Sequence, residues 1–158
     1  MIKKYLLIFL ISMVPLIELR GAIPIATVGY GLDYWTSLVV CVIGNMLPVP
    51  IIYFFARKFL IWGAKQKYIG KFCNFFLVKG EHAGQKLVVK SGRGGLFIAL
   101  MLFVGIPIPG TGAWTGTLGA SFLDMGFKST VLSVSLGVLL AGVIMAVAST
   151  GVLSIIGL

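Results

Sequence analysis

Two charged side chains interrupt an otherwise apolar segment near the N-terminus. Glu18 and Arg20 lie two residues apart, between Pro15 and Pro24. An unpaired charge at membrane depth is costly, so ionisable side chains there face a cavity, a partner or a substrate. A carboxylate can bind a proton or a cation, and a guanidinium forks onto phosphate oxygens. The pair predicts an ion- or substrate-binding role. The alternative is that both residues sit at headgroup level and merely end a helix.

A second break, rich in glycine and proline, reads Gly-Ile-Pro-Ile-Pro-Gly-Thr-Gly-Ala-Trp-Thr-Gly from residue 105 to residue 116. Proline removes backbone donors and glycine relaxes φ, so a regular helix cannot persist here. Free amides and threonine hydroxyls there could bind an anionic headgroup or an ion. A kinked helix-packing face is the alternative, because Gly112 and Gly116 have the close-approach spacing. The candidate substrate- or ion-binding residues are Glu18, Arg20, Gly21, Pro24, Pro107, Pro109, Gly110, Thr111, Trp114 and Thr115.

The composition indicates the environment of these residues. Of 158 residues, 59% are apolar and 11% charged, and the mean hydropathy is +1.08. Soluble domains carry about 25% charged residues. Thr36–Phe55 and Val131–Leu158 contain no charged side chain and are long enough to cross a bilayer. Lys3-Lys4 and the apolar run after them resemble a signal peptide, but no small-residue cleavage site follows, so we expect this segment to be retained. The sequence predicts one all-α integral membrane domain over residues 1–158.

Charge divides that domain into three zones. Nine of the thirteen basic residues lie between Arg57 and Arg93, accompanied by one acid, Glu81. The positive-inside rule places this loop in the cytoplasm. Within it, apolar side chains recur at the helical spacing i, i+3, i+4, i+7, which predicts an amphipathic helix in the interface that favours anionic lipid: Ile69, Phe72, Cys73 and Phe76. The alternative is a solvated loop whose aromatic residues pack on the membrane helices. Because the net charge of +9 follows topology, nucleic acid is a poor partner.

The two flanking zones look related. An offset of 91 residues aligns Gly21-Ala22 with Gly112-Ala113, and Leu32-Asp33 with Leu123-Asp124. Each zone has an apolar half-segment, a break, a short apolar piece, an Asp and a long apolar helix. We therefore divide the chain into a first repeat (1–57), a basic amphipathic connector (58–93) and a second repeat (94–158). Paired repeats with interrupted segments are a sequence indication of a transporter site.

Two topologies fit these repeats. Tyr5–Ile17 and Gly94–Ile106 each give about 20 Å of helix, too short to cross about 30 Å of hydrocarbon. If each break is the tip of a re-entrant hairpin, each repeat crosses once, the second repeat is inverted, and a cytoplasmic loop requires an external N-terminus. If each broken segment crosses fully, four spans leave both termini inside. Lys3 and Lys4 favour the second arrangement, and the short half-segments favour the first.

Both motifs resemble the small multidrug export protein family: Glu-Leu-Arg-Gly-Ala-Ile-Pro at 18–24, and Pro-Ile-Pro-Gly-Thr-Gly-Ala-Trp-Thr-Gly at 107–116. The resemblance covers nearly the whole chain. That family is considered a distant relative of the DedA superfamily, which includes proteins implicated in lipid scrambling and carrier-lipid recycling. The resemblance implies two re-entrant hairpins whose tips meet within the membrane. By position, Glu18 and Arg20 resemble the acid and arginine important in DedA proteins, but the second tip here has no arginine.

Other polar residues have more ordinary interpretations. We expect Asp33 and Asp124 to cap helices, and His82 beside Glu81 to lie in a solvated loop. Asn45, Pro48 and Pro50 should kink the Thr36–Phe55 helix and supply a polar contact in the core. Cys41 and Cys73 have no metal-ligand spacing or disulfide partner. No hydrolytic triad, P-loop or dinucleotide fingerprint is present, so we expect no enzyme activity, metal or cofactor.

Together these features predict a membrane transporter or lipid translocator for an anionic amphipathic substrate, a phospholipid or polyprenyl phosphate. Its transport could be coupled to a proton or a cation. Glu18 would bind the ion, Arg20 the phosphate, and the Pro107–Thr111 tip would supply backbone donors. We expect a homodimer in the cytoplasmic membrane of a prokaryote, in contact with anionic lipids. One rival is a proton-coupled small multidrug exporter, although Arg20 would repel cationic drugs. The other rival is a non-transporting membrane scaffold.

Overall fold

The computed structural model describes residues 1–15, 17–108 and 111–156, and within these ranges the regular elements are all helical. The elements are α1 (Ile2–Met13), α2 (Glu18–Pro24), a π-helical turn η1 (Ile25–Gly29), α3 (Tyr34–Met46), α4 (Pro48–Ala64), α5 (Gly70–Gly105), α6 (Ala113–Phe122) and α7 (Phe127–Ile156). The all-α prediction is confirmed for this part of the chain.

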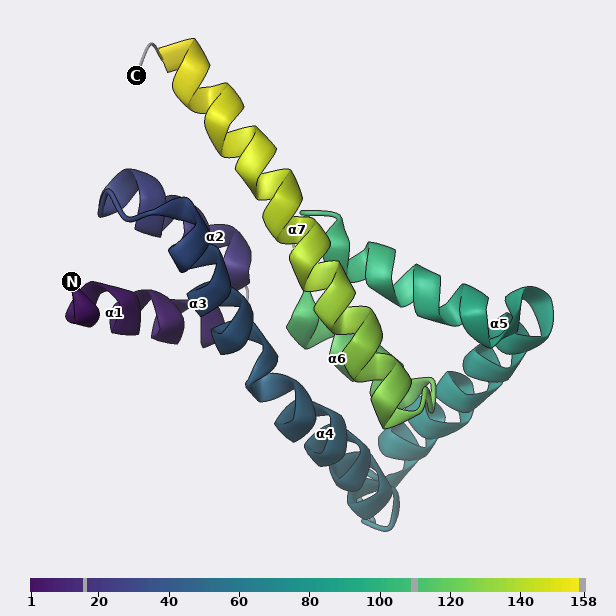
Figure 1. The fold of residues 1–158 in the computed structure, drawn as a ribbon. Coiled ribbons are helices and arrows are strands. Elements are labelled where there is room, and N and C mark those ends of the chain that lie inside the picture. Colours follow the sequence, from purple (N-terminus) through teal and green to yellow (C-terminus); the bar gives the residue numbers. More distant parts are fainter. Residues whose placement is uncertain (16, 109–110, 157–158) are drawn as a thin grey trace.

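The N-terminal elements fold back on one another as a helical hairpin (Figure 1). We call α1, α2 and η1 the first hairpin. Helix α1 ends at Met13 because Val14 precedes a proline, which disfavours the helical conformation, and Val14 is extended at φ −72° and ψ 129°. At the open end the Lys4 ammonium donates to the Tyr30 carbonyl at 3.4 Å and lies 5.5 Å from the centre of its ring. The chain thus leaves and returns to one place, as the hairpin alternative requires.

A second hairpin is formed by the last part of α5 and by α6. Helix α5 bends sharply at Gly92, whose φ of 70° and ψ of 173° are open to glycine, so Gly92–Gly105 is a separate apolar helix. It also ends before a proline, with Ile106 extended at φ −78° and ψ 120°. Each hairpin is followed by a long helix. One is α3 with α4, and the other is α7.

The two long helical stretches are apolar enough to cross a membrane, over Tyr34–Ala64 and over Phe127–Ala148. They run in opposite directions and lie in contact (Figure 1). Large apolar side chains point outward from them, with 67% of Phe55 and 68% of Val147 exposed, which suits contact with lipid. Pro48 and Pro50 lie where α3 meets α4, and Asn45 is buried there, so the predicted interruption is present.

The two aspartates have different roles, and one prediction is wrong. Asp33 caps α3, accepting from the amide and hydroxyl of Thr36 at 2.8 Å each, and these bonds hold the pKa of Asp33 below its usual range. Asp124 does not cap α7, which begins at Phe127. It lies in the preceding turn with φ of 54° and forms an ion pair with Arg57 of α4. The Asp124 carboxylate pairs with Arg57, which is distant in the sequence, and local residue spacing does not reveal such a partner.

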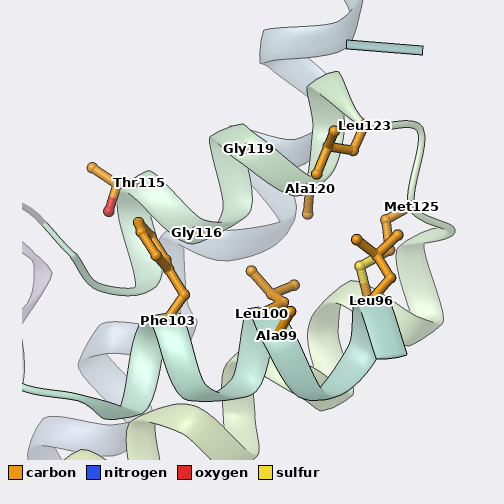
Figure 2. Close-up of a pocket in the computed structure, with 10 residues that line it drawn as sticks. All are labelled: Leu96, Ala99, Leu100, Phe103, Thr115, Gly116, Gly119, Ala120, Leu123 and Met125. Atoms are coloured by element: carbon orange, nitrogen blue, oxygen red, sulfur yellow. The ribbon is translucent and has the colours of Figure 1, made fainter. Parts of the chain in front are cut away.

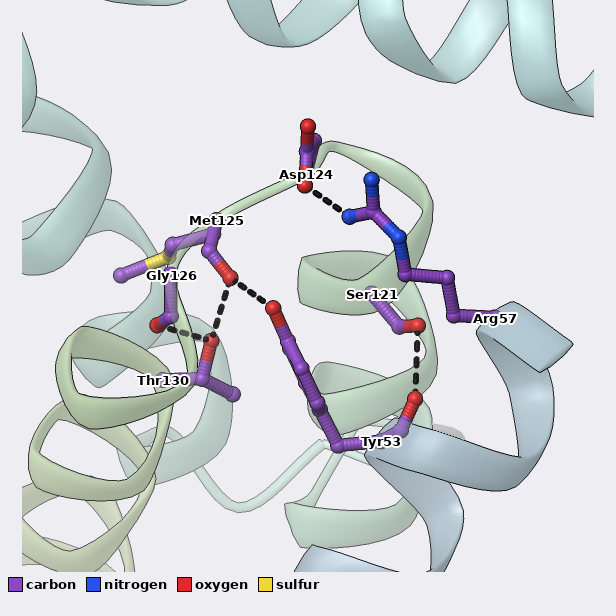
Figure 3. Close-up of polar contacts among 7 residues, drawn as sticks. All are labelled: Tyr53, Arg57, Ser121, Asp124, Met125, Gly126 and Thr130. Atoms are coloured by element: carbon purple, nitrogen blue, oxygen red, sulfur yellow. Dashed lines mark hydrogen bonds and ion pairs between the residues drawn. The ribbon is translucent and has the colours of Figure 1, made fainter.

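A polar cluster beside that ion pair fixes the end of the second hairpin (Figure 3). The Tyr53 hydroxyl donates to the Met125 carbonyl at 2.6 Å, and the Ser121 hydroxyl donates to the Tyr53 carbonyl at 3.0 Å. The Thr130 hydroxyl donates to the same Met125 oxygen at 3.2 Å. Helices α4, α6 and α7 are thereby joined at one end.

The predicted amphipathic segment is helical from Gly70, the start of α5. Cys73 is buried against Gly63 of α4, while 66% of Phe72 is exposed. Packing against the membrane helix α4, which the alternative interpretation proposed, therefore explains the apolar side chain at Cys73 but not the exposed one at Phe72. The side chains of Phe76 and Glu81 lie outside the described residues, and the His82 ring lies 2.9 Å from the Val78 carbonyl.

Candidate functional site

The turns of the two hairpins meet beside a cleft of about 550 Å³. Seven predicted site residues line it: Glu18, Arg20, Gly21, Pro107, Thr111, Trp114 and Thr115. Pro24 does not line the cleft. It lies inside α2 at the start of the π-helical turn, where a missing backbone donor is accommodated. Pro109 and Gly110 lie outside the described residues.

Glu18 binds the N-terminus of α6 in the other hairpin. Its Oε1 accepts from the amide of Trp114 at 3.1 Å, and its Oε2 accepts from the amide of Ala113 at 3.3 Å. These are amides that a helix leaves without intrahelical partners, at the positive end of its dipole. A carboxylate is therefore the matching group. Glu18 is 6% exposed and has a left-handed φ of 48°, which strains a residue with a side chain.

Gly112 makes that approach possible. A Cβ on Gly112 would overlap the Glu18 carboxylate, with only 2.6 Å to its Cδ. The φ of 152° and ψ of −172° at Gly112 belong to a region open almost solely to glycine. This role of Gly112 was not predicted, although the residue stands in the second motif.

Arg20 binds the opposite pole of the second hairpin, around the C-terminus of α5. Its Nη1 donates to the carbonyls of Ile108 and Thr111 at 2.5 Å each. Its Nη2 donates to the carbonyls of Val104 and Ile106 at 3.0 Å each. A cation is the matching group at the negative end of a helix. All four bonds are made to backbone carbonyls, so Arg20 organises the turn between α5 and α6.

Trp114 makes the third contact between the hairpins, and here the side chain belongs to the second hairpin and the backbone group to the first. Its indole Nε1 donates to the carbonyl of Met13, at the end of α1, at 3.1 Å. Trp114 thus satisfies a terminal carbonyl of the first hairpin, as Arg20 does for the second. We call these contacts of Glu18, Arg20 and Trp114 the tip clamp.

The second turn is braced from within by Thr111. Its hydroxyl lies 3.0 Å from the carbonyl of Ile106 and 2.9 Å from that of Ile108, both of which also accept from Arg20. The Thr115 hydroxyl lies 3.4 Å from the Gly112 carbonyl. The threonine hydroxyls predicted to face a ligand are thus engaged with backbone carbonyls.

Several residues of the cleft carried no sequence signal. Leu118 and Met145 contribute its apolar wall, with Pro15, Ile17 and Ile108. Leu118 follows Trp114 by four residues on α6, which spacing could have suggested. Met145 comes from α7, and only the tertiary structure brings it here.

A second, apolar groove of about 380 Å³ adjoins the cleft and shares Trp114 and Leu118 with it. Its other walls come from α4, α5 and α6, with Phe55, Phe59 and Phe72 among them. A polar cleft joined to an aromatic groove can hold a molecule that is polar at one end and apolar at the other. In the described residues no three His, Cys, Asp or Glu side chains gather as metal ligands.

The fold and cleft define an α-helical membrane protein whose two hairpins clamp each other at their tips. A family model described as "Putative small multi-drug export protein" matches residues 18–144, which include every described residue of the tip clamp except Met13. The chain belongs to this family. No curated protein and no solved structure matches it.

Proposed function

We propose that the protein is a membrane transporter or lipid translocator for an anionic amphipathic substrate, a phospholipid or polyprenyl phosphate. The observation that carries the proposal is the tip clamp beside an amphipathic cleft. In this proposal the substrate phosphate competes with the loop carbonyls for Arg20, since a guanidinium binds phosphate oxygens in the same fork geometry. Binding would then loosen the second turn and let the tips part.

The same geometry offers a means of coupling to protons or cations. The two hydrogen bonds from backbone amides to Glu18 need carboxylate oxygens that accept, and they are strongest when the carboxylate is charged. A proton or cation on Glu18 would weaken its attraction to the positive end of α6. Release of that end would open the clamp from the other side. We therefore assign ion binding to Glu18 and substrate phosphate to Arg20.

The topology that we propose is a pair of inverted repeats with two re-entrant hairpins. Support comes from the contact of Lys4 with Tyr30, the two proline-ended hairpins and the opposite directions of the long helices. The basic connector lies on the cytoplasmic side of a prokaryotic plasma membrane by the positive-inside rule. The distant relationship to DedA proteins belongs to the same proposal.

Two long apolar helices enclose little space, so we propose a homodimer surrounded by anionic lipid. The exposed apolar side chains of α4, such as Ile51 and Phe55, could face lipid or a second copy. The proposal is of transport without covalent chemistry, a metal or a cofactor.

The decisive experiment is translocation of fluorescent phosphatidylglycerol and of polyprenyl phosphate in liposomes that carry the purified protein. Wild type should move one or both, and Arg20→Lys and Glu18→Gln should reduce the rate by about tenfold or more, because each weakens charge-assisted contacts. Arg57→Lys is the matched control, since Arg57 pairs with Asp124 outside the cleft. Thermal unfolding of each variant separates loss of function from loss of fold.

The family description favours a second candidate, export of drugs, and for this candidate we propose proton coupling through Glu18. The groove lined by Phe55, Phe59, Phe72 and Trp114 fits an apolar or aromatic drug as well as a lipid chain. The same liposomes, given a pH gradient and a fluorescent hydrophobic cation, test it. Drug movement without lipid movement would replace the lipid proposal. Inactivity toward both, with folded protein, would leave the scaffold hypothesis.

A further inference from the structure

Another apolar groove, separate from the one lined by Trp114 and Leu118, lies on the other side of α6, between α6 and the last part of α5 (Figure 2). Its volume is about 260 Å³. Leu96, Leu100 and Phe103 of α5 form one wall, and Gly116, Gly119 and Ala120 of α6 form the other. At Gly116 the absence of a side chain lets α5 pack closely, since a Cβ there would lie 2.6 Å from Val104, whereas at Gly119 the space is open. A Cβ on Gly119 would meet nothing within 4 Å.

One end of this groove adjoins a polar pocket of about 320 Å³ that is lined by Arg93, Asp124 and Ser129. The groove and the pocket share Leu96, Leu123 and Met125 as walls, so they lie side by side. Asp124 is already paired with Arg57. Arg93 is exposed and has no ion pair or hydrogen bond among the described residues, so the mouth of the groove carries a net positive charge.

The other end of the groove lies next to the cleft that contains Glu18 and Arg20, because Thr115 lines both. The wall between these ends is α6, whose ten residues span about 15 Å. That length is about half of the 30 Å hydrocarbon core. The length of the groove is therefore about the depth of one leaflet, and in the proposed topology its cationic end lies on the cytoplasmic side with the basic connector.

We propose that this groove holds one acyl chain of an anionic phospholipid, with its phosphate at Arg93 and its chain along Gly119. Charge, length and apolar lining all match this occupant. The inference rests on the proposed transport of an anionic amphiphile and deepens it, because a lipid held here lies next to the tip clamp. The Ser129 hydroxyl at the mouth can donate to the same phosphate.

The test uses photoactivatable phosphatidylglycerol with a diazirine near the end of one acyl chain, added to lipid nanodiscs that contain the full chain. Mass spectrometry maps the labelled peptides. We expect labelling to concentrate on 96–103 and 115–123. Gly119→Leu fills the groove and should abolish this labelling, whereas Gly94→Leu, at another open helical glycine outside the groove, should not. Gly119→Ala, with a smaller side chain, provides an intermediate variant if the leucine prevents folding.

The headgroup is tested with phosphatidylcholine that carries the same photoactivatable chain. Phosphatidylglycerol should label the groove about tenfold more strongly, since the Arg93 contact is charge-assisted. Arg93→Gln should remove this preference, and Lys90→Gln, an exposed neighbour, should retain it. Uniform labelling of all lipid-facing helices, insensitive to Gly119→Leu, would mean annular lipid only and would overturn the proposal. Equal labelling by both lipids would overturn it as well.

This readout is binding and does not depend on transport. If wild-type liposomes move no lipid while the groove is labelled as described, the transport proposal fails and the lipid site stands. If lipid moves but the groove is not labelled, the site fails and the transport proposal stands.

Discussion

At the scale of single residues, the tip clamp follows the electrostatics of helix ends. Glu18 accepts from the first amides of α6, and Arg20 donates to carbonyls at and just beyond the C-terminus of α5, so each charge faces the helix pole of opposite sign. Their separation by two residues, which discourages contact between them on a regular helix, suits this division. One short segment therefore recognises both ends of the opposite turn.

Gly112 is the residue at which this arrangement is most sensitive. Gly112→Ala should lower the free energy of unfolding by about 1–3 kcal/mol from backbone strain alone, and should also displace Glu18. Thermal unfolding in detergent checks this. The matched control is Gly119→Ala, which has open space and should be neutral or stabilising by about 0.5–1 kcal/mol. Equal stability of the two variants would contradict the packing of Glu18 against Gly112.

Trp114→Phe tests the reciprocal contact, because it removes the indole donor and keeps an aromatic ring. The Met13 carbonyl then loses its partner, and we expect a loss of about 1 kcal/mol of stability. A double-mutant comparison with Arg20→Lys should show coupling, since both side chains join the same two turns. Strict additivity of the two variants would mean that the contacts act independently.

The sequence predicted which residues lie at the cleft better than it predicted their partners. Glu18, Arg20 and the 105–116 break were identified because charge and proline are costly in an apolar segment. Their partners are backbone groups about 90 positions away, and no local pattern encodes such contacts. Arg20 was expected to bind phosphate directly, yet four carbonyls hold it in this structure.

At the scale of elements, proline placement defines the hairpins. Val14 and Ile106 both precede proline and both leave the helical region. The second half-segment ends within one residue of the predicted Ile106, but α1 ends at Met13, before the predicted Ile17. The packing of the hairpins was less predictable. Helix α1 crosses α3 at Gly44, where an added Cβ would lie 2.7 Å from the Phe9 carbonyl and overlap the Ser12 hydroxyl. A glycine inside an apolar helix does not reveal which helix it contacts.

Gly44→Ala should therefore push α1 away from α3. Because the obstacles include the Phe9 backbone carbonyl as well as the Ser12 hydroxyl, we expect a loss of about 1–3 kcal/mol of stability. Thermal unfolding measures the loss, and protease sensitivity of the first hairpin should rise with it. Gly29→Ala is the control, because the nearest atom to its Cβ lies at 4.0 Å. Should Gly44→Ala be as stable as Gly29→Ala, the two helices do not cross as closely as described.

At the scale of the whole molecule, the open question from the sequence was whether each broken segment crosses the membrane or returns. Lys4 lies beside Tyr30, which supports the proposed return of the chain to the side that it came from. In that topology each half contributes one spanning stretch, Tyr34–Ala64 or Phe127–Ala148. The chain start and the connector between α4 and α5 would then lie on opposite sides, contrary to what Lys3 and Lys4 suggest.

Cysteine labelling in intact cells tests this arrangement. In a background with Cys41 and Cys73 replaced, Lys4→Cys and Tyr68→Cys would each be exposed to a membrane-impermeant maleimide, since both side chains are exposed. With the basic connector inside, Lys4→Cys should be labelled in intact cells and Tyr68→Cys only after permeabilisation. A Tyr30→Cys variant should behave as Lys4→Cys does, because the hairpin returns to its starting side. The four-span alternative instead places positions 4 and 68 together and position 30 opposite, so the three positions distinguish the two topologies without any assumption about substrate.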